Sequence, residues 1–459
     1  MSTRRETDTL GAIDVPADRF WGAQTQRSLL HFRIGSERWP RSMLRAFGIV
    51  KRSAALVHGQ HGRLPAELVA AIVAAADQVV AGELDDHFPL HIWQTGSATQ
   101  THMNVNEVVA FVAARRLGRP VHPNDEVNRA QSSNDVVPTA MHIAAVEEVR
   151  LRLLPALLGL RQQLHGKSLE FGDVIKLGRT HGMDAVVLTV GQELSAWVSQ
   201  LDHGAQAIRN SLGHLHELAI GGTAVGTGLN APPGFGAEVT WQIAQFTQIR
   251  FVPPQNRFEA NASHDALVEL HGALKRLAVS LLKIANDIRI LASGPRGGLG
   301  ELLLPANEPG SSMMPGKVNP TQAEALAMVA MRVIGNDVTV SLAGSQGVLQ
   351  LNACKPLLAH VVLESIGLLS DAMTSLDAHC IAGLQLDRGR IAGHVARSLM
   401  LATALTGAIG HERAAQVAAW AEAHDTTVAD AARQLGVLDA ATLAALLDPA
   451  QMLAPRPEA

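Results

Sequence analysis

The feature that most constrains the fold is an unbroken three–four spacing of apolar residues between Asp265 and Leu291. Its apolar positions are Leu267, Leu270, Leu274, Leu277, Leu281, Ile284, Ile288 and Leu291. Because an α-helix turns once in about 3.6 residues, these positions share one helix face, and the apolar span from Leu267 to Leu291 predicts about 37 Å of a single helix. A sustained repeat of this kind indicates packing at a shallow left-handed angle against other long helices.

The same spacing recurs earlier in the chain, at Leu153, Leu157, Leu160 and Leu164 and at Leu194, Trp197, Leu201 and Ile208. No convincing alternation of strand type separates these segments, so the sequence predicts a mainly all-α subunit. We expect three domains. They are a mixed, mostly helical N-terminal lobe (1–134), a central long-helix bundle (135–388) and a small Ala-rich helical C-terminal domain (389–459).

Composition excludes several classes of protein. The chain of 459 residues has 38 basic and 42 acidic residues, hence a net charge of −4, with 3% aromatic residues and no tyrosine. It therefore lacks the basic field and the stacking side chains that a nucleic-acid partner requires. Two cysteines, Cys354 and Cys380, give neither a disulfide framework nor a CxxC metal motif, so a reducing compartment is expected.

No membrane partner is expected either. The uncharged run 218–237 has the length of a membrane span, but it contains six glycines and the pair Pro232-Pro233, which is typical of a loop. Arg4 and Arg5 are followed at once by acidic residues rather than by an apolar segment, so the N-terminus does not read as a signal peptide. We therefore expect a cytoplasmic protein.

The most informative polar segment is Gly310-Ser311-Ser312-Met313-Met314-Pro315-Gly316-Lys317-Val318-Asn319-Pro320. It is not a phosphate-binding P-loop, because the glycine spacing is too long by one residue and Val318 replaces the hydroxyl that would hold magnesium. It predicts a loop with two hydroxyls and an ammonium beside a helix start, with Asn319 as cap, Pro320 at the first position and Gln322 completing a capping box. The alternative is a surface turn with a solvated lysine.

Three further polar runs carry candidate functional groups, and each could also have an ordinary structural role. The run 131–135 offers donors for a carboxylate, or simply an N-cap. The run 97–107 is too polar for a core helix unless it lines a cavity. Arg179-Thr180-His181 begins a segment that we expect to lead into a helix, and His181 is either a proton carrier or a structural histidine.

Several of these strings together resemble the class II fumarate hydratases of the fumarase/aspartase superfamily, along nearly the whole chain. The similar segments are 11–18, 21–25, His122-Pro123-Asn124-Asp125, Ser132-Ser133-Asn134-Asp135, 221–228 and the loop 310–320. The last string is specific for the superfamily rather than for a substrate.

This resemblance implies a homotetramer whose core combines the long helices of four subunits, with each active site shared between chains. It implies reversible hydration of a small dicarboxylate, fumarate, to (S)-malate through an aci-carboxylate intermediate, without metal or other cofactor. A doubly charged intermediate requires fixed donors and positive charge where its charge develops, which explains why hydroxyl, amide and ammonium groups are wanted.

The resemblance also implies roles for individual residues. The catalytic residues would be Ser311 as carbon base, His181 with Glu324 at the hydroxyl-bearing carbon, and Lys317. Substrate-binding positions would be Ser97, Ala98, Thr99, Ser132, Ser133, Asn134, Thr180, Ser312 and Asn319. A second, non-catalytic dicarboxylate site would comprise Arg119, His122, Pro123, Asn124 and Asp125.

The chain departs from the family's usual residues near these positions. Met183 stands where glutamine is common, Val187 where proline is common, Ala98 where glycine is common and His102 where asparagine is common. These changes leave open a substituted fumarate as substrate. The sequence is also compatible with a related lyase acting on aspartate, and with a catalytically weak scaffold protein that keeps the bundle.

Overall fold

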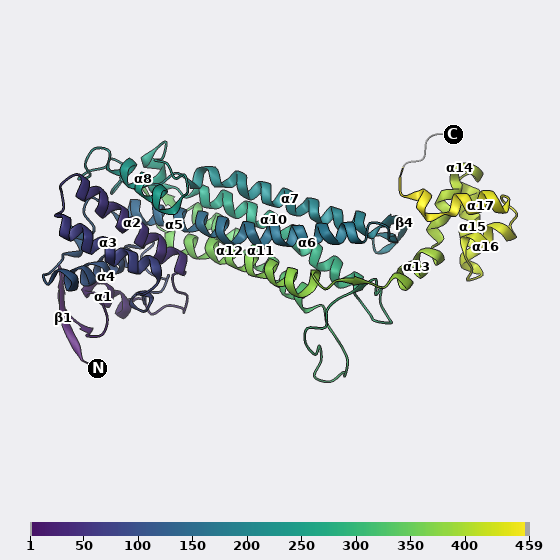
Figure 1. Cartoon of the computed structure of the whole chain (residues 1–459), viewed down its shortest axis with the longest axis horizontal. Helices are drawn as coiled ribbons and strands as arrows, with labels where there is room; N and C mark the ends of the chain where they lie inside the picture. Colours follow the sequence, from purple (N-terminus) through teal and green to yellow (C-terminus); the bar gives the residue numbers. More distant parts are fainter. Residues whose placement is uncertain (1, 455–459) are drawn as a thin grey trace. The chain divides into compact units, whose positions relative to one another are not determined.

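The computed structural model describes residues 2–454 and is mainly helical (Figure 1). Its contacts divide the chain into two compact units. Unit 1 comprises 1–155, 204–278 and 329–370, and unit 2 comprises 156–203, 279–328 and 371–459. The predicted mainly all-α class is confirmed, whereas the predicted division into three domains stays a prediction.

The N-terminal part of unit 1 is a group of helices preceded by a hairpin. Strands β1 (Thr3–Asp8) and β2 (Gly11–Pro16) pair antiparallel. The helices are α1 (Ala23–His31), α2 (Arg41–Gln60), α3 (Ala66–Ala81), α4 (Thr99–Leu117), α5 (Ser133–Glu148) and α8 (Phe235–Thr247). Helix α2 contacts α3, α5 and α8, and its buried face carries Met43, Phe47 and Val50. This packing fixes the ends of α4 and α5, where two predicted binding runs lie.

Five long helices form the bundle (Figure 1). They are α6 (Leu154–Glu170), α7 (Val190–Leu215), α10 (Asp265–Leu291), α11 (Thr321–Gly344) and α12 (Lys355–Leu376). The predicted helix Asp265–Leu291 is confirmed at both ends, and all eight apolar residues of its repeat are buried. The repeats assigned to α6 and α7 are also buried, which confirms the bundle prediction.

The absence of strands between these helices was a wrong expectation. Strands β3 (Ile175–Thr180) and β4 (Met183–Thr189) form an antiparallel hairpin between α6 and α7. Leu177 and Val187 pack in a core formed with the C-terminal helices of unit 2, whereas Val186 is exposed. A register shift between Leu177 and Arg179 interrupts the alternation of buried and exposed residues, so the period-two signal is too weak to detect in the sequence.

The C-terminal part of unit 2 is helical, as its Ala-rich pattern predicts. It contains α13 (Arg388–Arg397), α14 (Thr406–Ile409), α15 (His411–Ala423), α16 (Val428–Gln434) and α17 (Ala440–Leu447). The remaining short elements are α9 (Arg257–Ala262) and the two-residue strands β5 (Leu302–Leu303), β6 (Gly347–Val348), β7 (Leu351–Asn352) and β8 (Gln385–Leu386).

Two bundle segments, Thr321–Gly344 and Lys355–Ile381, are long and apolar enough to cross a membrane by length and composition. The run 218–237, which the sequence had singled out for this test, is an irregular segment followed by the start of α8. Two such helices are weak evidence for membrane spans, because core helices of soluble proteins can have the same length and composition.

Candidate functional site

The loop 310–319 closes on itself before α11 begins. The backbone N–H of Gly310 donates to the Lys317 carbonyl at 2.8 Å, and Asn319 Nδ2 donates back to the Gly310 carbonyl at 2.6 Å. Within this closed loop, Ser311 Oγ accepts from the backbone N–H groups of Met313 and Met314, at 3.2 and 3.0 Å. Donated hydrogens stabilise negative charge on an oxygen, so these two N–H groups are placed where they could assist this hydroxyl as a base.

The start of α11 differs from the predicted capping box. The helix begins at Thr321, Asn319 uses its amide to close the loop, and Gln322 accepts from Ser375 Oγ at 2.6 Å. The side chain of Asn319, which the sequence predicted to cap the helix, is instead held by its hydrogen bond within the loop. Glu324 lies in the first turn of α11, as expected, and the side chain of Lys317 is exposed.

His181 lies at the tip of the β3–β4 hairpin rather than ahead of a helix. Thr180 pairs with Met183, so His181 and Gly182 form a two-residue turn with φ of 56° and 76°. Positive φ at both positions is the geometry of a hairpin turn whose twist matches the strands, and Gly182 adopts it without a side-chain clash. The turn leaves the side chains of Thr180, His181 and Met183 exposed.

The segment Ser97–Thr99 forms the N-terminus of α4. Ala98 is its N-cap residue with a left-handed backbone (φ 59°), and its side chain is fully buried. The hydroxyls of Ser97 and Thr99 lie 2.8 Å apart, on either side of the buried alanine. Ala98 can therefore serve a ligand only through its backbone, while the two hydroxyls stay on the outer side of the helix start.

The run 132–135 begins α5 with a capping box, which is the ordinary structural role expected of an N-cap. Ser132 Oγ accepts from Asn134 N at 3.2 Å, and Asp135 Oδ1 accepts from Ser132 N at 2.9 Å. Asp135 Oδ2 also accepts from the backbone N–H groups of Gly221 and Thr223, at 3.0 and 2.9 Å. Burial raises the pKa of Asp135 to about 6, and these backbone donors oppose the shift.

Asp135 thus ties the glycine-rich run 221–228 to α5. Gly221 has φ of +90°, and a Cβ on it would lie 2.5 Å from Gly236 Cα, so only glycine fits there. Asn134 Nδ2 donates to the Ala224 carbonyl at 2.8 Å. Two strings that the family resemblance picked out separately are therefore in contact.

A buried lysine, Lys51 on α2, lies under this run and was missed in the sequence. Its Nζ is 2.7 Å from His102 Nε2, and His102 Nδ1 is 3.1 Å from Ser133 Oγ. Lys51 and His102 are each 1% exposed. The available signal was a lysine within the mostly apolar stretch 46–57, at a position on the helix face that is turned toward the protein core.

Residues of the predicted second dicarboxylate site also lie close together. Arg119 pairs with Glu126 at 3.1 Å, and His122 Nδ1 accepts from the backbone N–H groups of Asn124 and Asp125 at 3.3 and 3.0 Å. His122, Pro123 and Asn124 line a cavity of about 730 Å³ together with residues of the N-terminal hairpin and α1. Pro123, Asn124 and Asp125 lie in a short π-helical turn, Pro123–Val127, and the dicarboxylate site itself stays a prediction.

The predicted substrate and catalytic residues fall into two groups. Unit 1 holds Ser97, Ala98, Thr99, Ser132, Ser133 and Asn134, and unit 2 holds Thr180, His181, Ser311, Ser312, Lys317, Asn319 and Glu324. Their assignment to one active site stays a prediction.

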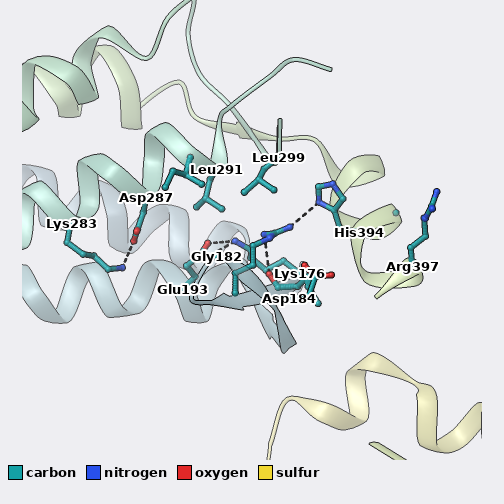
Figure 2. Close-up of a pocket in the computed structure, with 14 residues that line it drawn as sticks. Lys176, Gly182, Asp184, Glu193, Lys283, Asp287, Leu291, Leu299, His394 and Arg397 are labelled. Carbon is teal, nitrogen blue, oxygen red and sulfur yellow. Dashed lines mark hydrogen bonds and ion pairs between the residues drawn. The ribbon is translucent and has the colours of Figure 1, made fainter. Parts of the chain in front are cut away.

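A cavity of about 900 Å³ in unit 2 lies beside the hairpin that carries His181 (Figure 2). Its wall includes Lys176, which binds Glu193 at 2.7 Å and the buried carboxylate of Glu301 at 3.0 Å. Arg179 and His394 also contact Glu301, at 2.8 and 3.1 Å. Burial raises the pKa of Glu301, but these cationic and hydrogen-bonding neighbours outweigh it and bring the pKa below its ordinary value.

The ion pairs that Glu301 makes with Lys176, Arg179 and His394 fix the base of the hairpin. Their cationic groups are already paired with carboxylates, and the cavity wall includes Gly182 but none of the side chains predicted to be catalytic. Among residues 2–454, no group of three or more His, Cys, Asp and Glu side chains is arranged to hold a metal ion.

Comparison with known proteins places these strings in one family. Residues 11–335 match the lyase family model, and residues 401–454 match the model of the fumarase C C-terminus. The class II fumarate hydratase of Ralstonia nicotianae is 53% identical, covering 99% of this chain and all of its own. Class II fumarate hydratase 1 of Pseudomonas aeruginosa is 54% identical, covering 98% of both chains.

Solved structures agree over the same length. The class II fumarase of Schistosoma mansoni has a TM-score of 0.96 at 43% identity, covering 98% of this chain and 99% of its own. The fumarate lyase:delta crystallin of Brucella melitensis, in its native form, has a TM-score of 0.90 at 40% identity, covering 97% and 100%. The chain belongs to the class II fumarate hydratases of the fumarase/aspartase superfamily.

Proposed function

We propose that this protein catalyses the reversible hydration of fumarate to (S)-malate. The observation that carries the proposal is the pair of backbone N–H groups directed at Ser311 Oγ, together with the Lys317 ammonium in the same closed loop. A serine hydroxyl is too weak a base to remove a carbon-bound proton, and donors that stabilise its ionised form correct that weakness.

In the malate-to-fumarate direction, ionised Ser311 takes the proton from the carbon next to one carboxylate. The electron pair moves into that carboxylate and forms the aci-carboxylate. The double bond then forms as the hydroxyl on the neighbouring carbon leaves with a proton from His181, which Glu324 assists, and departs as water. The Lys317 ammonium and the amide of Asn319 stabilise the negative charge that develops on the carboxylate.

Substrate carboxylates would be held by Ser97, Thr99, Ser132, Ser133, Asn134, Thr180, Ser312 and the backbone at Ala98. All except Ala98 carry a side-chain hydroxyl or amide, which donates to a carboxylate without adding a mobile proton to the reaction. The turn geometry supports the role of His181, because a hairpin tip exposes the ring while the strands and the Lys176–Glu301 pair fix its base.

The decisive assay follows fumarate absorbance after addition of purified protein, with and without ammonia. Water-dependent loss of fumarate with formation of (S)-malate is expected. Loss only in ammonia would assign an aspartate lyase, and no loss in either direction would assign a scaffold. Ser311→Ala should lower kcat by about 10³-fold, while the matched control Ser195→Ala, a helical serine remote from the loop in sequence, should retain wild-type turnover.

We further infer a homotetramer with shared active sites, acting in the cytoplasm. Supporting this, α11 exposes an apolar stripe at Met328, Met331, Val338 and Leu342, each more than half exposed in the single chain. With Gly335 these residues continue a three–four repeat, the spacing that packs helices side by side. Val338→Glu should dissociate the assembly in sedimentation experiments and abolish activity, whereas a monomeric wild type with full turnover would contradict the inference.

A further inference from the structure

Beneath the run 132–134, five side chains form one continuous hydrogen-bonded chain in unit 1. Lys51 Nζ contacts His102 Nε2 at 2.7 Å, Asn128 Oδ1 at 3.0 Å and Gln131 Oε1 at 2.8 Å. His102 Nδ1 continues the chain to Ser133 Oγ at 3.1 Å. Four separate parts of the sequence meet here: α2, α4, the turn before α5 and the first residue of α5.

The direction of each hydrogen bond follows from counting hydrogens. The amide nitrogen of Gln131 donates to the carbonyls of Val127 and Arg129, which leaves its oxygen to accept from Lys51. The amide nitrogen of Asn128 donates to the Gln131 carbonyl, so its oxygen also accepts from Lys51. A lysine ammonium has three hydrogens, and the third points to His102 Nε2.

With Nε2 as acceptor, the neutral imidazole carries its hydrogen on Nδ1. That hydrogen is donated to Ser133 Oγ. A hydroxyl oxygen that accepts on one side keeps its own hydrogen free to donate on another. The hydroxyl of Ser133 is thereby available as a donor to a ligand.

We propose that Lys51 and His102 are positioning residues that hold the Ser133 hydroxyl as a hydrogen-bond donor to a substrate carboxylate. The proposal rests on the proposed function, since it takes Ser133 to bind the dicarboxylate. It assigns a purpose to His102, one of the positions at which this chain departs from the family's usual residue. The hydrogen-bonded chain also conveys part of the lysine's positive charge toward the carboxylate without placing a mobile ammonium in the site.

The charges around this chain have one effect that favours the assignment and one that opposes it. Burial lowers the pKa of His102 and so does the nearby Lys51 ammonium, which keeps the imidazole neutral and able to accept at Nε2. Burial also lowers the pKa of Lys51 well below its ordinary value, which works against the ammonium that the assignment requires, and the carboxylate of Asp135 opposes that shift. Loss of the Lys51 proton would reverse the direction of these hydrogen bonds. His102 Nε2–H would then donate to the Lys51 amine, and His102 Nδ1 would accept a hydrogen bond from the Ser133 hydroxyl.

A double-mutant cycle on fumarate hydration tests whether His102 acts through Ser133. His102→Leu and Ser133→Ala should each raise KM about tenfold with kcat within about threefold of wild type, since each removes one hydrogen bond to bound substrate. The double variant should be no worse than either single variant, because the second change has nothing left to remove. His102→Asn, whose amide can replace the Nδ1–H donor, should recover most of the lost affinity.

Independent effects that multiply in the double variant, or a loss confined to kcat, would overturn the positioning role while leaving the proposed function intact. A wild-type protein that does not hydrate fumarate would overturn both. If His102→Leu fails to fold, neutron diffraction from crystals grown of the wild-type protein decides between the two hydrogen arrangements. Hydrogens on His102 Nδ1 and three on Lys51 Nζ are expected, whereas a Ser133 hydrogen pointing at Nδ1 refutes the assignment.

Discussion

Replacement of Gly96 by alanine should damage both stability and substrate affinity, because this residue touches another backbone directly. A Cβ on Gly96 would lie 1.5 Å from the Ala353 carbonyl oxygen and 2.3 Å from its carbon. Non-bonded carbon contacts normally begin near ~3.5 Å, so the two segments must separate by about 2 Å. The backbone N–H of Lys355, which donates to the Gly96 carbonyl at 3.0 Å, would be pulled away in the process.

The cost can be estimated from these two effects. Overpacking in a well-packed region costs about 1 to 3 kcal/mol, and loss of one buried hydrogen bond adds about 1 kcal/mol. We therefore expect Gly96→Ala to lower the free energy of unfolding by about 2 to 4 kcal/mol. Because Ser97 and Thr99 follow directly, the same displacement should raise KM for fumarate.

Thermal unfolding and fumarate kinetics, measured on the same preparations, check this prediction. Gly166→Ala in α6 is the matched control, since a Cβ there has no neighbour within 4 Å. It should be neutral or stabilise the protein by up to about 1 kcal/mol, with unchanged kinetics. If Gly96→Ala melts with the wild type and has the same KM, the close approach of these two segments is not a feature of the protein in solution.

Three further predictions concern other residues. Burial lowers the pKa of His142 from 6.5 to about 4. The unfolded chain therefore binds a proton that the folded chain refuses, and stability should fall by about 3 kcal/mol as pH drops through that interval; urea unfolding should show a shallower decline in His142→Asn. Glu107 accepts from the backbone N–H groups of Gly22, Gln24 and Thr25 at the start of α1, so Glu107→Gln should cost about 2 kcal/mol and speed proteolysis near α1, and unchanged cleavage would contradict this. Met183→Gln restores an amide beside the His181 turn and should lower KM for fumarate; identical KM values would show that this position does not face substrate.

The helices could be predicted from the sequence because their signal is local. The apolar residues of α10 lie on one face because of their spacing within the helix itself. This spacing alone therefore predicted Asp265–Leu291 and its buried face. The hairpin around His181 was missed because its strands are short and interrupted by a register shift. The division into three domains, the shared active site and the roles of the predicted site residues stay predictions.

The candidate site shows the same contrast between what local sequence reveals and what depends on distant contacts. The sequence by itself determined which strings carry hydroxyl, amide and ammonium groups, and it determined the family, since those strings are specific. Only the tertiary structure decided that Lys51 lies under Ser133, that Asp135 binds the backbone at 221–223, and that Gly96 lies against Ala353. These are contacts between segments far apart in the chain, and neither helical periodicity nor residue type encodes which distant segment will fill the space beside a given side chain.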